Sequence, residues 1–168
     1  METRRLPLDG VRVLDFSRVI AGPTCSMALG DLGADVIKVE HPDRGDDTRD
    51  YGLRVGRTET TYFNSMNRNK RSITLDLQRE EDRDTARELV RQCDVVVQNF
   101  KAGGMAKMGL AYEDLKAIKP DIVYCSITGY ASDGMEAQRP GYDIVIQGEA
   151  GLMAINGDAH LPPLKFGT

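Results

Sequence analysis

The chain has 168 residues, of which 40% are hydrophobic and 29% charged, and its formal net charge is −4. This length is typical of one globular domain that buries its core without disulfides or metals. The acidic balance argues against a nucleic-acid-binding protein, whose surface usually carries a basic excess. The sequence has no apolar run approaching the ~20 residues of a membrane-spanning helix, and its first residues lack the apolar core of a signal peptide. We therefore expect neither nucleic acid nor membrane as a partner.

The cysteines and histidines restrict the chemistry further. Cys25, Cys93 and Cys125 are far apart and form no C-x-x-C pair. Cys93 and Cys125 lie beside apolar, strand-like runs, so we expect buried free thiols, which are typical of a reducing compartment and predict a cytoplasmic location. His41 and His160 are the only histidines, both in predicted loops, and are too few for an ordinary His/Cys metal site.

The first sixty residues predict a strand–helix–strand unit followed by a long loop. Residues 11–16 are a short β-branched run after an Asp-Gly turn, residues 24–32 favour a helix that ends at Gly33, and residues 36–40 favour a second strand. A connection of this kind makes the two strands parallel. The polar segment 41–60 is longer than most connections, which indicates a functional loop.

The remaining residues continue the alternation of strand and helix. We expect strands at 72–77, 94–98 and 121–127, helices at 78–93, 112–118 and 142–152, a loop or distorted helix at 101–110, and an irregular tail at 157–168. This order predicts an α/β fold with a mainly parallel sheet. Ligands of such folds bind at the carboxyl ends of the strands, where we expect the segments that follow residues 16, 98 and 127.

Familiar phosphate-binding and hydrolase motifs are absent: the sequence has no G-x-G-x-x-G, no G-x-x-x-x-G-K-[ST] and no G-x-S-x-G. Two segments could still bind an anion. In residues 18–23, Gly22 would let the backbone approach a ligand at a helix start. Residues 67–71 hold three cations before a strand and could form a basic rim. Taken alone, these segments are more often an ordinary turn and a solvated surface, and Asp143 fits either a helix cap or a functional acid. The residues alone predict an α/β domain that binds an anionic metabolite.

Several blocks in a fixed order resemble one family. The blocks are residues 8–23 (LDGVRVLDFSRVIAGP), 30–40 (GDLGADVIKVE), 45–49 (GDDTR), 67–77 (NRNKRSITLDL), 97–100 (VQNF), 108–110 (MGL), 126–130 (SITGY) and 139–143 (RPGYD). Together they resemble the N-terminal half of the family III coenzyme A transferases, which have α-methylacyl-CoA racemases as relatives. Each block is a weak signal, but the ordered series covers nearly the whole chain.

The resemblance implies a Rossmann-like domain that binds coenzyme A (CoA), and a homodimer in which two full-length chains interlock. It implies acyl-CoA and a carboxylic acid as substrates and no permanently bound cofactor or metal. An aspartate would attack the acyl-CoA thioester to give a mixed anhydride and CoA thiolate, and the thiolate would then form an enzyme-bound thioester from which the acceptor acid collects CoA. Hydrogen-bond donors would stabilise the developing oxyanion.

The resemblance also implies which residues contact CoA. By position these are Arg18, Ile20, Ala21, His41, Leu75, Gln78, Asn99, Phe100 and Lys107. The similar formyl-CoA transferases have glutamine where Ile20 stands and arginine where His41 stands. The first difference argues against formyl or oxalyl specificity, and the second weakens one phosphate contact.

The catalytic aspartate of the resembled family falls in an Asp-x-x-(Thr/Ser)-Gly segment after a Pro- and Gly-rich stretch. Residues 162–168 match that stretch, so we expect the nucleophile a few residues beyond Thr168. Residues 1–168 would then form a partial N-terminal CoA-binding domain, inactive alone, without the family's second, smaller domain and returning C-terminal segment.

Tyr142 and Asp143 are expected to support catalysis. The racemases have a histidine base where Tyr142 stands, and tyrosine, with a reference pKa near 10, is a poor base at neutral pH. We therefore expect a transferase, with a racemase-like enzyme and a non-enzymatic CoA-binding fragment as the alternatives.

Overall fold

The computed structural model describes residues 5–158 and 160–167 and divides into two compact units, Met1–Ile127 and Thr128–Thr168, which are described separately below. The assignment of residues 1–168 to one partial CoA-binding domain stays a prediction. No helix in the described parts of the chain combines the length and apolarity needed to cross a membrane.

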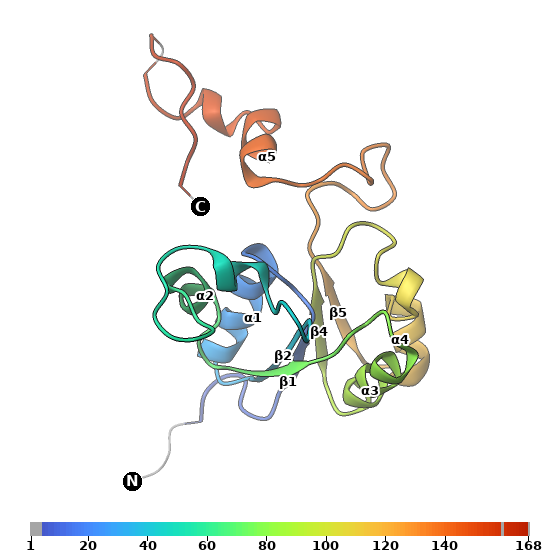
Figure 1. Ribbon diagram of the computed structural model, residues 1–168. Coiled ribbons are helices and arrows are strands. Elements are labelled where there is room, and N and C mark those ends of the chain that lie inside the picture. Colours follow the sequence, from blue (N-terminus) through green and yellow to red (C-terminus); the bar gives the residue numbers. More distant parts are fainter. Residues whose placement is uncertain (1–4, 159, 168) are drawn as a thin grey trace. The chain divides into compact units, whose positions relative to one another are not determined.

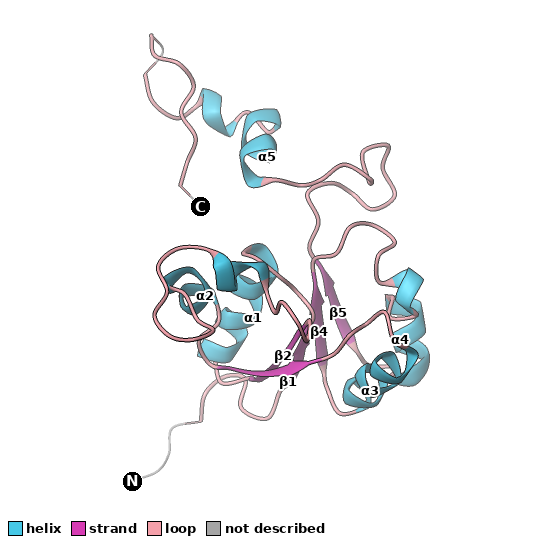
Figure 2. Cartoon of the chain, in the orientation of Figure 1, coloured by secondary structure: helices cyan, strands magenta, loops and turns pink. Residues whose placement is uncertain are grey.

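The first unit is an α/β fold (Figures 1 and 2). Its elements are β1 (Arg12–Asp15), α1 (Ala21–Asp31), β2 (Asp35–Glu40), η1 (Asp47–Asp50), α2 (Thr61–Met66), β3 (Lys70–Thr74), α3 (Glu80–Arg91), β4 (Val95–Gln98), η2 (Ala106–Met108), α4 (Tyr112–Ile118) and β5 (Val123–Ser126). The five strands form one sheet in the order β3-β2-β1-β4-β5, and every neighbouring pair is parallel. The predicted α/β fold with a mainly parallel sheet is therefore confirmed.

Helices cover both faces of this sheet, so its central strands are apolar on both sides. Leu14 of β1 and Val96 of β4 pack with Val90 of α3 in one core cluster, which also contains α4 residues. Val13 and Val97, their sequence neighbours, belong to a second cluster with residues of α1. Because successive side chains of a strand point to opposite faces, four-residue strands suffice to build two cores.

Some element boundaries differ from the sequence-based prediction. The strand expected at 72–77 occupies Lys70–Thr74, because it pairs with β2 from Val36 opposite Lys70 onward. Helix α2 was not predicted. It begins after Thr60, whose hydroxyl accepts a hydrogen bond of 3.1 Å from the Phe63 amide. The helix expected at 142–152 ends at Glu149, shortly before the left-handed Gly151.

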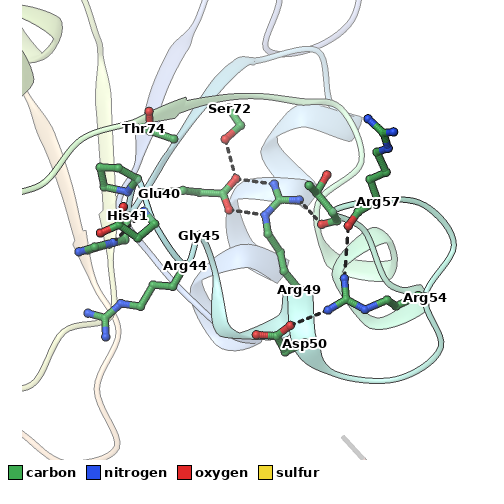
Figure 3. Close-up of a pocket in the computed structure, with 13 residues that line it drawn as sticks. Glu40, His41, Arg44, Gly45, Arg49, Asp50, Arg54, Arg57, Ser72 and Thr74 are labelled. Carbon is green, nitrogen blue, oxygen red and sulfur yellow. Dashed lines mark hydrogen bonds and ion pairs between the residues drawn. The ribbon is translucent and has the colours of Figure 1, made fainter.

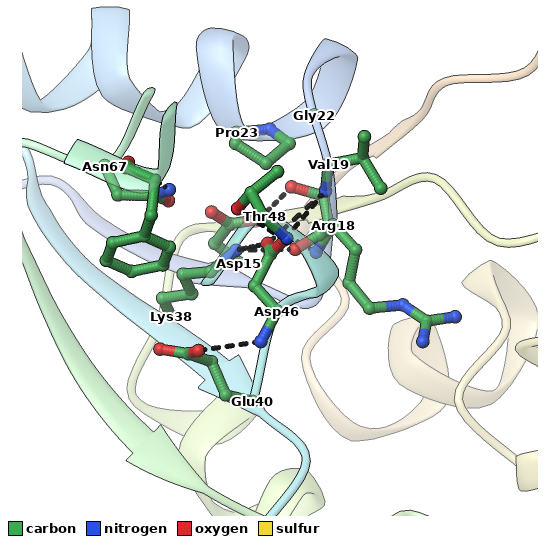
Figure 4. Close-up of polar contacts among 12 residues, drawn as sticks. Asp15, Arg18, Val19, Gly22, Pro23, Lys38, Glu40, Asp46, Thr48 and Asn67 are labelled. Carbon is green, nitrogen blue, oxygen red and sulfur yellow. Dashed lines mark hydrogen bonds and ion pairs between the residues drawn. The ribbon is translucent and has the colours of Figure 1, made fainter. Parts of the chain in front are cut away.

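A buried ion pair fixes the polar segment 41–60 to the carboxyl edge of the sheet (Figure 4). Lys38 Nζ lies 2.8 Å from Asp46 Oδ2, and the two side chains are 1% and 0% exposed. Lys38 also donates a hydrogen bond of 2.8 Å to the Ser17 carbonyl. Asp46 accepts hydrogen bonds from the amide of Thr48 (2.9 Å) and from the amide of Val19 (3.3 Å). The pair thus joins β2 to the segments that follow both β1 and β2.

A second buried cation lies beside the first. Lys70 Nζ is 3.2 Å from Asp15 Oδ2 and donates to the carbonyl of Pro23 (2.9 Å) and to Asn67 Oδ1 (3.0 Å). Asp15 also accepts a hydrogen bond from the hydroxyl of Ser26 in α1. This cluster connects β1, β3 and α1 through charges that need one another as partners, because a buried charge without a partner is costly.

The end of β2 is held by a third pair. Arg49 contacts Glu40 with both Nε (2.6 Å) and Nη2 (2.7 Å), a bidentate arrangement. Glu40 also accepts the Asp46 amide at 3.0 Å. The Arg49 guanidinium lies 3.7 Å from the centre of the Phe63 ring, so it packs segment 41–60 against α2. The predicted long loop is thus an ordered structure.

The second unit has its own small set of contacts. Its helical elements are α5 (Asp143–Glu149) and η3 (Leu152–Ala154). Glu149 accepts a hydrogen bond of 2.7 Å from the Tyr130 hydroxyl and pairs with Arg139. Gln147 accepts the Phe166 amide at 2.8 Å, which ties the tail to α5.

We expect Asp46→Asn to lower the free energy of unfolding by about 3 kcal/mol, because it leaves the buried Lys38 ammonium without its counter-charge. Urea denaturation measures this change. The matched control is Asp50→Asn, which removes an ion pair whose side chains are 61% and 72% exposed and should cost less than about 1 kcal/mol. Equal losses in the two variants would contradict a special role for Asp46.

Lys70 gives a prediction about pH. Burial lowers its pKa from 10.5 to about 8, although Asp15 acts in the opposite direction. Between these values the unfolded chain binds more protons at Lys70 than the folded chain, so stability rises with pH in that window. Relative to Lys70→Met, the wild type should gain on the order of 2 kcal/mol between pH 7.5 and 10.

This gain is the difference between two denaturation curves measured at each pH with a reducing agent present. Taking the difference cancels the titration of the cysteines, which both proteins share. The exposed Lys101→Met is the control, and its difference from wild type should not change with pH. A pH-independent difference for Lys70→Met would show that Lys70 keeps an ordinary pKa in the folded chain.

Candidate functional site

The strand order creates a switch point between β1 and β4. From β1 the chain proceeds through β2 to β3 on one side, and then returns to β4 and β5 on the other. The segments after β1 and β4 therefore leave the sheet in different directions and open a crevice at its carboxyl edge. Arg18 follows β1 and Asn99 follows β4, so two of the predicted contact residues lie at this point.

Asn99 joins the two segments. Its Oδ1 accepts a hydrogen bond of 2.9 Å from the Arg18 amide, and its Nδ2 donates one of 2.7 Å to the Arg18 carbonyl. The next residue, Val19, has φ of 69°, an unusual value for a β-branched side chain. The Arg18–Val19 turn is thus held by Asn99 on one side and by Asp46 on the other.

A pocket of about 150 Å³ lies at this edge, and we call it the edge pocket. Its lining comprises Phe16, Arg18, Val39, Glu40, His41, Arg44, Leu75, Asp76, Leu77, Gln78, Phe100 and Met108. The structure therefore brings together five of the nine residues predicted to contact CoA, namely Arg18, His41, Leu75, Gln78 and Phe100. They come from four different strand ends, so only the fold can gather them.

The polar groups of the edge pocket have defined orientations. The Arg18 guanidinium lies 5.1 Å from the centre of the Phe100 ring, which places a cation over an aromatic wall. His41 Nδ1 accepts a hydrogen bond of 3.2 Å from the Asp43 amide. In the neutral imidazole this leaves the proton on Nε2, so His41 can donate to a ligand.

The other four predicted contact residues do not line the edge pocket. Asn99 uses its amide group on the Arg18 backbone. Ile20 is the N-cap residue of α1, Ala21 is its first residue, and Lys107 is exposed in η2. Their contact with CoA stays a prediction.

Sequence reasoning missed several residues of this lining, above all Arg44, Asp76 and Met108. Arg44 lies in the segment predicted as a functional loop, and Met108 lies in one of the blocks that carried the resemblance. Their positions in these segments were the available signal, but residue spacing could not show which side chains turn toward the edge of the sheet.

The two segments that could bind an anion have different outcomes. A Cβ atom at Gly22 would lie 2.1 Å from the Ser17 Cβ, so the glycine allows α1 to pack on Ser17, and its approach to a ligand stays a prediction. The cations of residues 67–71 form no free basic rim. Arg68 pairs with Asp31 and Arg71 with Asp35, and the third, Lys70, is buried.

In the second unit, Tyr142 is the N-cap residue of α5 and Asp143 is its first residue. Tyr142 is 68% exposed, and Asp143 Oδ2 accepts a hydrogen bond of 2.8 Å from Gln147 four residues later. Asp143 thus helps to order the helix start, and the catalytic support expected of both residues stays a prediction.

The three cysteines are free thiols, as expected. Cys93 is buried, and burial raises its pKa to about 11, which makes it unreactive. The expectation of full burial is wrong for Cys125, which is half-buried like Cys25.

Known proteins with similar sequences are named as CoA-transferases. A model of CoA-transferase family III matches residues 8–168. The chain is 49% identical over 162 residues to succinyl-CoA:glutarate CoA-transferase of Mus musculus, which covers 96% of the chain and 37% of that protein. It is 45% identical over 174 residues to succinate–glutarate CoA-transferase of Agrobacterium fabrum, which covers 100% of the chain and 44% of that protein.

A solved structure agrees with these sequence matches. The crystal structure of a CAIB/BAIF family protein from Brucella suis is 49% identical, with a TM-score of 0.93 over 98% of this chain and 44% of that chain. The chain thus spans about two fifths of the length of the proteins it resembles. The matched length, the identities and the shared fold show that this chain belongs to CoA-transferase family III.

Proposed function

We propose that the protein containing this chain transfers CoA between an acyl-CoA thioester and a free carboxylic acid, and that CoA binds in the edge pocket. The observation that carries the proposal is the gathering of Arg18, His41, Leu75, Gln78 and Phe100 around one pocket at the switch point of the sheet. Membership of CoA-transferase family III supports the reaction class.

The chemistry of the pocket fits a ligand with both apolar and anionic parts. Phe16, Val39 and Met108 provide an apolar wall. Arg18 and Arg44 add guanidinium groups, which bind phosphate through paired hydrogen bonds. CoA carries phosphates at one end and a long, flexible arm with a thiol at the other, so it matches a pocket with these two kinds of lining.

In the proposed mechanism an aspartate carboxylate, which the resemblance places outside residues 1–168, attacks the thioester carbonyl. The carbon–sulfur bond breaks, and CoA leaves as a thiolate while a mixed anhydride forms. The thiolate then attacks the aspartyl carbonyl of the anhydride and releases the donor's acid. The acceptor carboxylate attacks the resulting aspartyl thioester, which expels CoA thiolate and forms a second mixed anhydride. The thiolate then attacks the acceptor's carbonyl carbon in this anhydride, which gives the acceptor's CoA thioester and frees the aspartate. Tyr142 and Asp143 are proposed to support these steps.

The acids are proposed to be short dicarboxylates, because both relatives described above are named for succinate or succinyl-CoA and for glutarate. The proposal includes an interlocked homodimer and a cytoplasmic location, which come from the resemblance and from the free thiols respectively.

Calorimetry with CoA tests the binding part of the proposal on the 168-residue chain. We expect Arg18→Gln and Phe100→Ala each to weaken binding about tenfold, because each removes one half of the Arg18–Phe100 wall and Arg18 also loses a charge-assisted contact. Arg91→Gln, on the exposed surface of α3, is the control and should bind like wild type. Unchanged affinity in both pocket variants would show that CoA does not bind in the edge pocket.

Transfer itself is tested with the complete protein that contains this chain, incubated with succinyl-CoA and glutarate in deuterium oxide. A transferase produces glutaryl-CoA and succinate, detected by mass spectrometry, without deuterium entering an α-carbon. A racemase-like enzyme instead exchanges the α-proton of a 2-methylacyl-CoA and leaves the acids unchanged. Binding of CoA with neither reaction would favour a non-enzymatic CoA-binding protein.

A further inference from the structure

A second and larger pocket adjoins the edge pocket and is lined by the end of β2, the segment that follows it, and β3. It has a volume of about 490 Å³ and lies between segment 41–58 and the residues Ser72 and Thr74. We call it the arginine pocket, because four arginines line it: Arg44, Arg49, Arg54 and Arg57 (Figure 3). Of its lining residues, His41 is the one that was predicted to contact CoA.

Two of these arginines are already neutralised. Arg49 forms the bidentate pair with Glu40, and Arg54 Nη2 lies 3.1 Å from Asp50 Oδ1. These two also hold the backbone of the pocket wall. Arg49 Nη1 donates a hydrogen bond of 2.8 Å to the Thr58 carbonyl, and Arg54 Nη1 donates one of 3.3 Å to the Arg57 carbonyl. The Arg49 and Arg54 side chains therefore hold the backbone at residues 57 and 58 in place.

The other two arginines have no such partner. Within the described residues, no carboxylate oxygen lies within 4.0 Å of a guanidinium nitrogen of Arg44 or Arg57. Both side chains are exposed, and Figure 3 shows them on opposite sides of the Glu40–Arg49 pair. Asp43 is the one lining acid without an ion pair among these residues, so the pocket keeps a net positive charge after all pairs are counted.

We propose that the arginine pocket binds a ligand with two separated oxyanion groups, one at Arg44 and one at Arg57. Guanidinium groups recognise carboxylates and phosphates, and two of them on opposite sides of a polar pocket favour a double-ended anion over a single one. The volume of the pocket exceeds what one small oxyanion fills. The negative charge of Asp43 weakens the binding of any anion in this pocket. A dianion must therefore engage both arginines to bind tightly.

The neighbouring edge pocket narrows the sources of such a ligand. Glu40, His41 and Arg44 line both pockets, so the two are neighbours. This step rests on the proposed function: the anionic groups then belong either to a dicarboxylic acid substrate or to the separated phosphates of bound CoA. Both sources would present two separated oxyanion groups to the arginines. They differ in whether these groups are carboxylates or phosphates.

Calorimetric titration of the 168-residue chain separates these sources. The probes are glutarate with its single-anion analogue butyrate, and adenosine 3′,5′-bisphosphate with its single-phosphate analogue 5′-AMP. We expect one double-ended probe to bind at least tenfold more tightly than its analogue. Arg44→Gln and Arg57→Gln should each reduce that affinity at least fivefold, while Arg91→Gln should not. Tighter binding of glutarate identifies the acid, and tighter binding of the bisphosphate identifies CoA.

The inference is overturned if neither double-ended probe exceeds its analogue, or if both arginine variants bind like wild type. Since Arg44 and Arg57 are exposed, the variants should fold, and circular dichroism checks this. A parallel titration with CoA keeps the two proposals apart. CoA binding that is sensitive to Arg18→Gln, together with no preference for dianions, refutes only the arginine pocket, whereas insensitivity to Arg18→Gln refutes the edge pocket as the CoA site.

Discussion

The buried pair of Lys38 and Asp46 is the interaction on which the site depends. An ammonium group inside the protein requires a counter-charge, and the counter-charge comes from a segment that has no regular strand or long helix of its own. Once Asp46 is held at the sheet, its oxygen atoms also hold the amides of Val19 and Thr48. One electrostatic requirement therefore orders both the turn after β1 and the segment after β2, which supply much of the edge pocket.

The parallel topology provides the second constraint. Because β1 is central and the chain returns past it to form β4, the loops after these two strands diverge and leave a crevice. The Asn99 side chain bridges the crevice at its base by bonding both the amide and the carbonyl of Arg18. Arg18 is then free to use its guanidinium over Phe100, while its backbone is fixed. A flexible side chain on a rigid backbone is suited to binding a phosphate-bearing ligand.

The fate of the cations shows how the same residue type takes different roles. Lys70 points into the core, Arg68 and Arg71 neutralise surface acids, and Arg49 braces segment 41–60. Each has a carboxylate partner, so none adds net charge to a binding surface. Among the described residues, the pocket-lining arginines without an ion pair are Arg18, Arg44 and Arg57. Arg18 lies in the turn after β1 and the other two lie in segment 41–60, and the buried pair of Lys38 and Asp46 holds both segments in place. Some cations of this region therefore stabilise the fold through ion pairs, while neighbouring arginines keep their charge available for a ligand.

The sequence by itself determined the fold class, the succession of five strands along the chain, and the family, because apolar periodicity and ordered motifs are local properties of the chain. The sequence also predicts a functional role for the segment 41–60 and, through the resemblance, for the turn after β1. Only the tertiary structure decided which charges are consumed by partners, since Lys70 meets Asp15 and Arg68 meets Asp31 across long stretches of sequence. For the same reason it alone showed that Gly22 packs on Ser17, and that Arg44 turns toward the pockets. Local pattern specifies an element, but the pairing of buried charges depends on which elements the fold brings together.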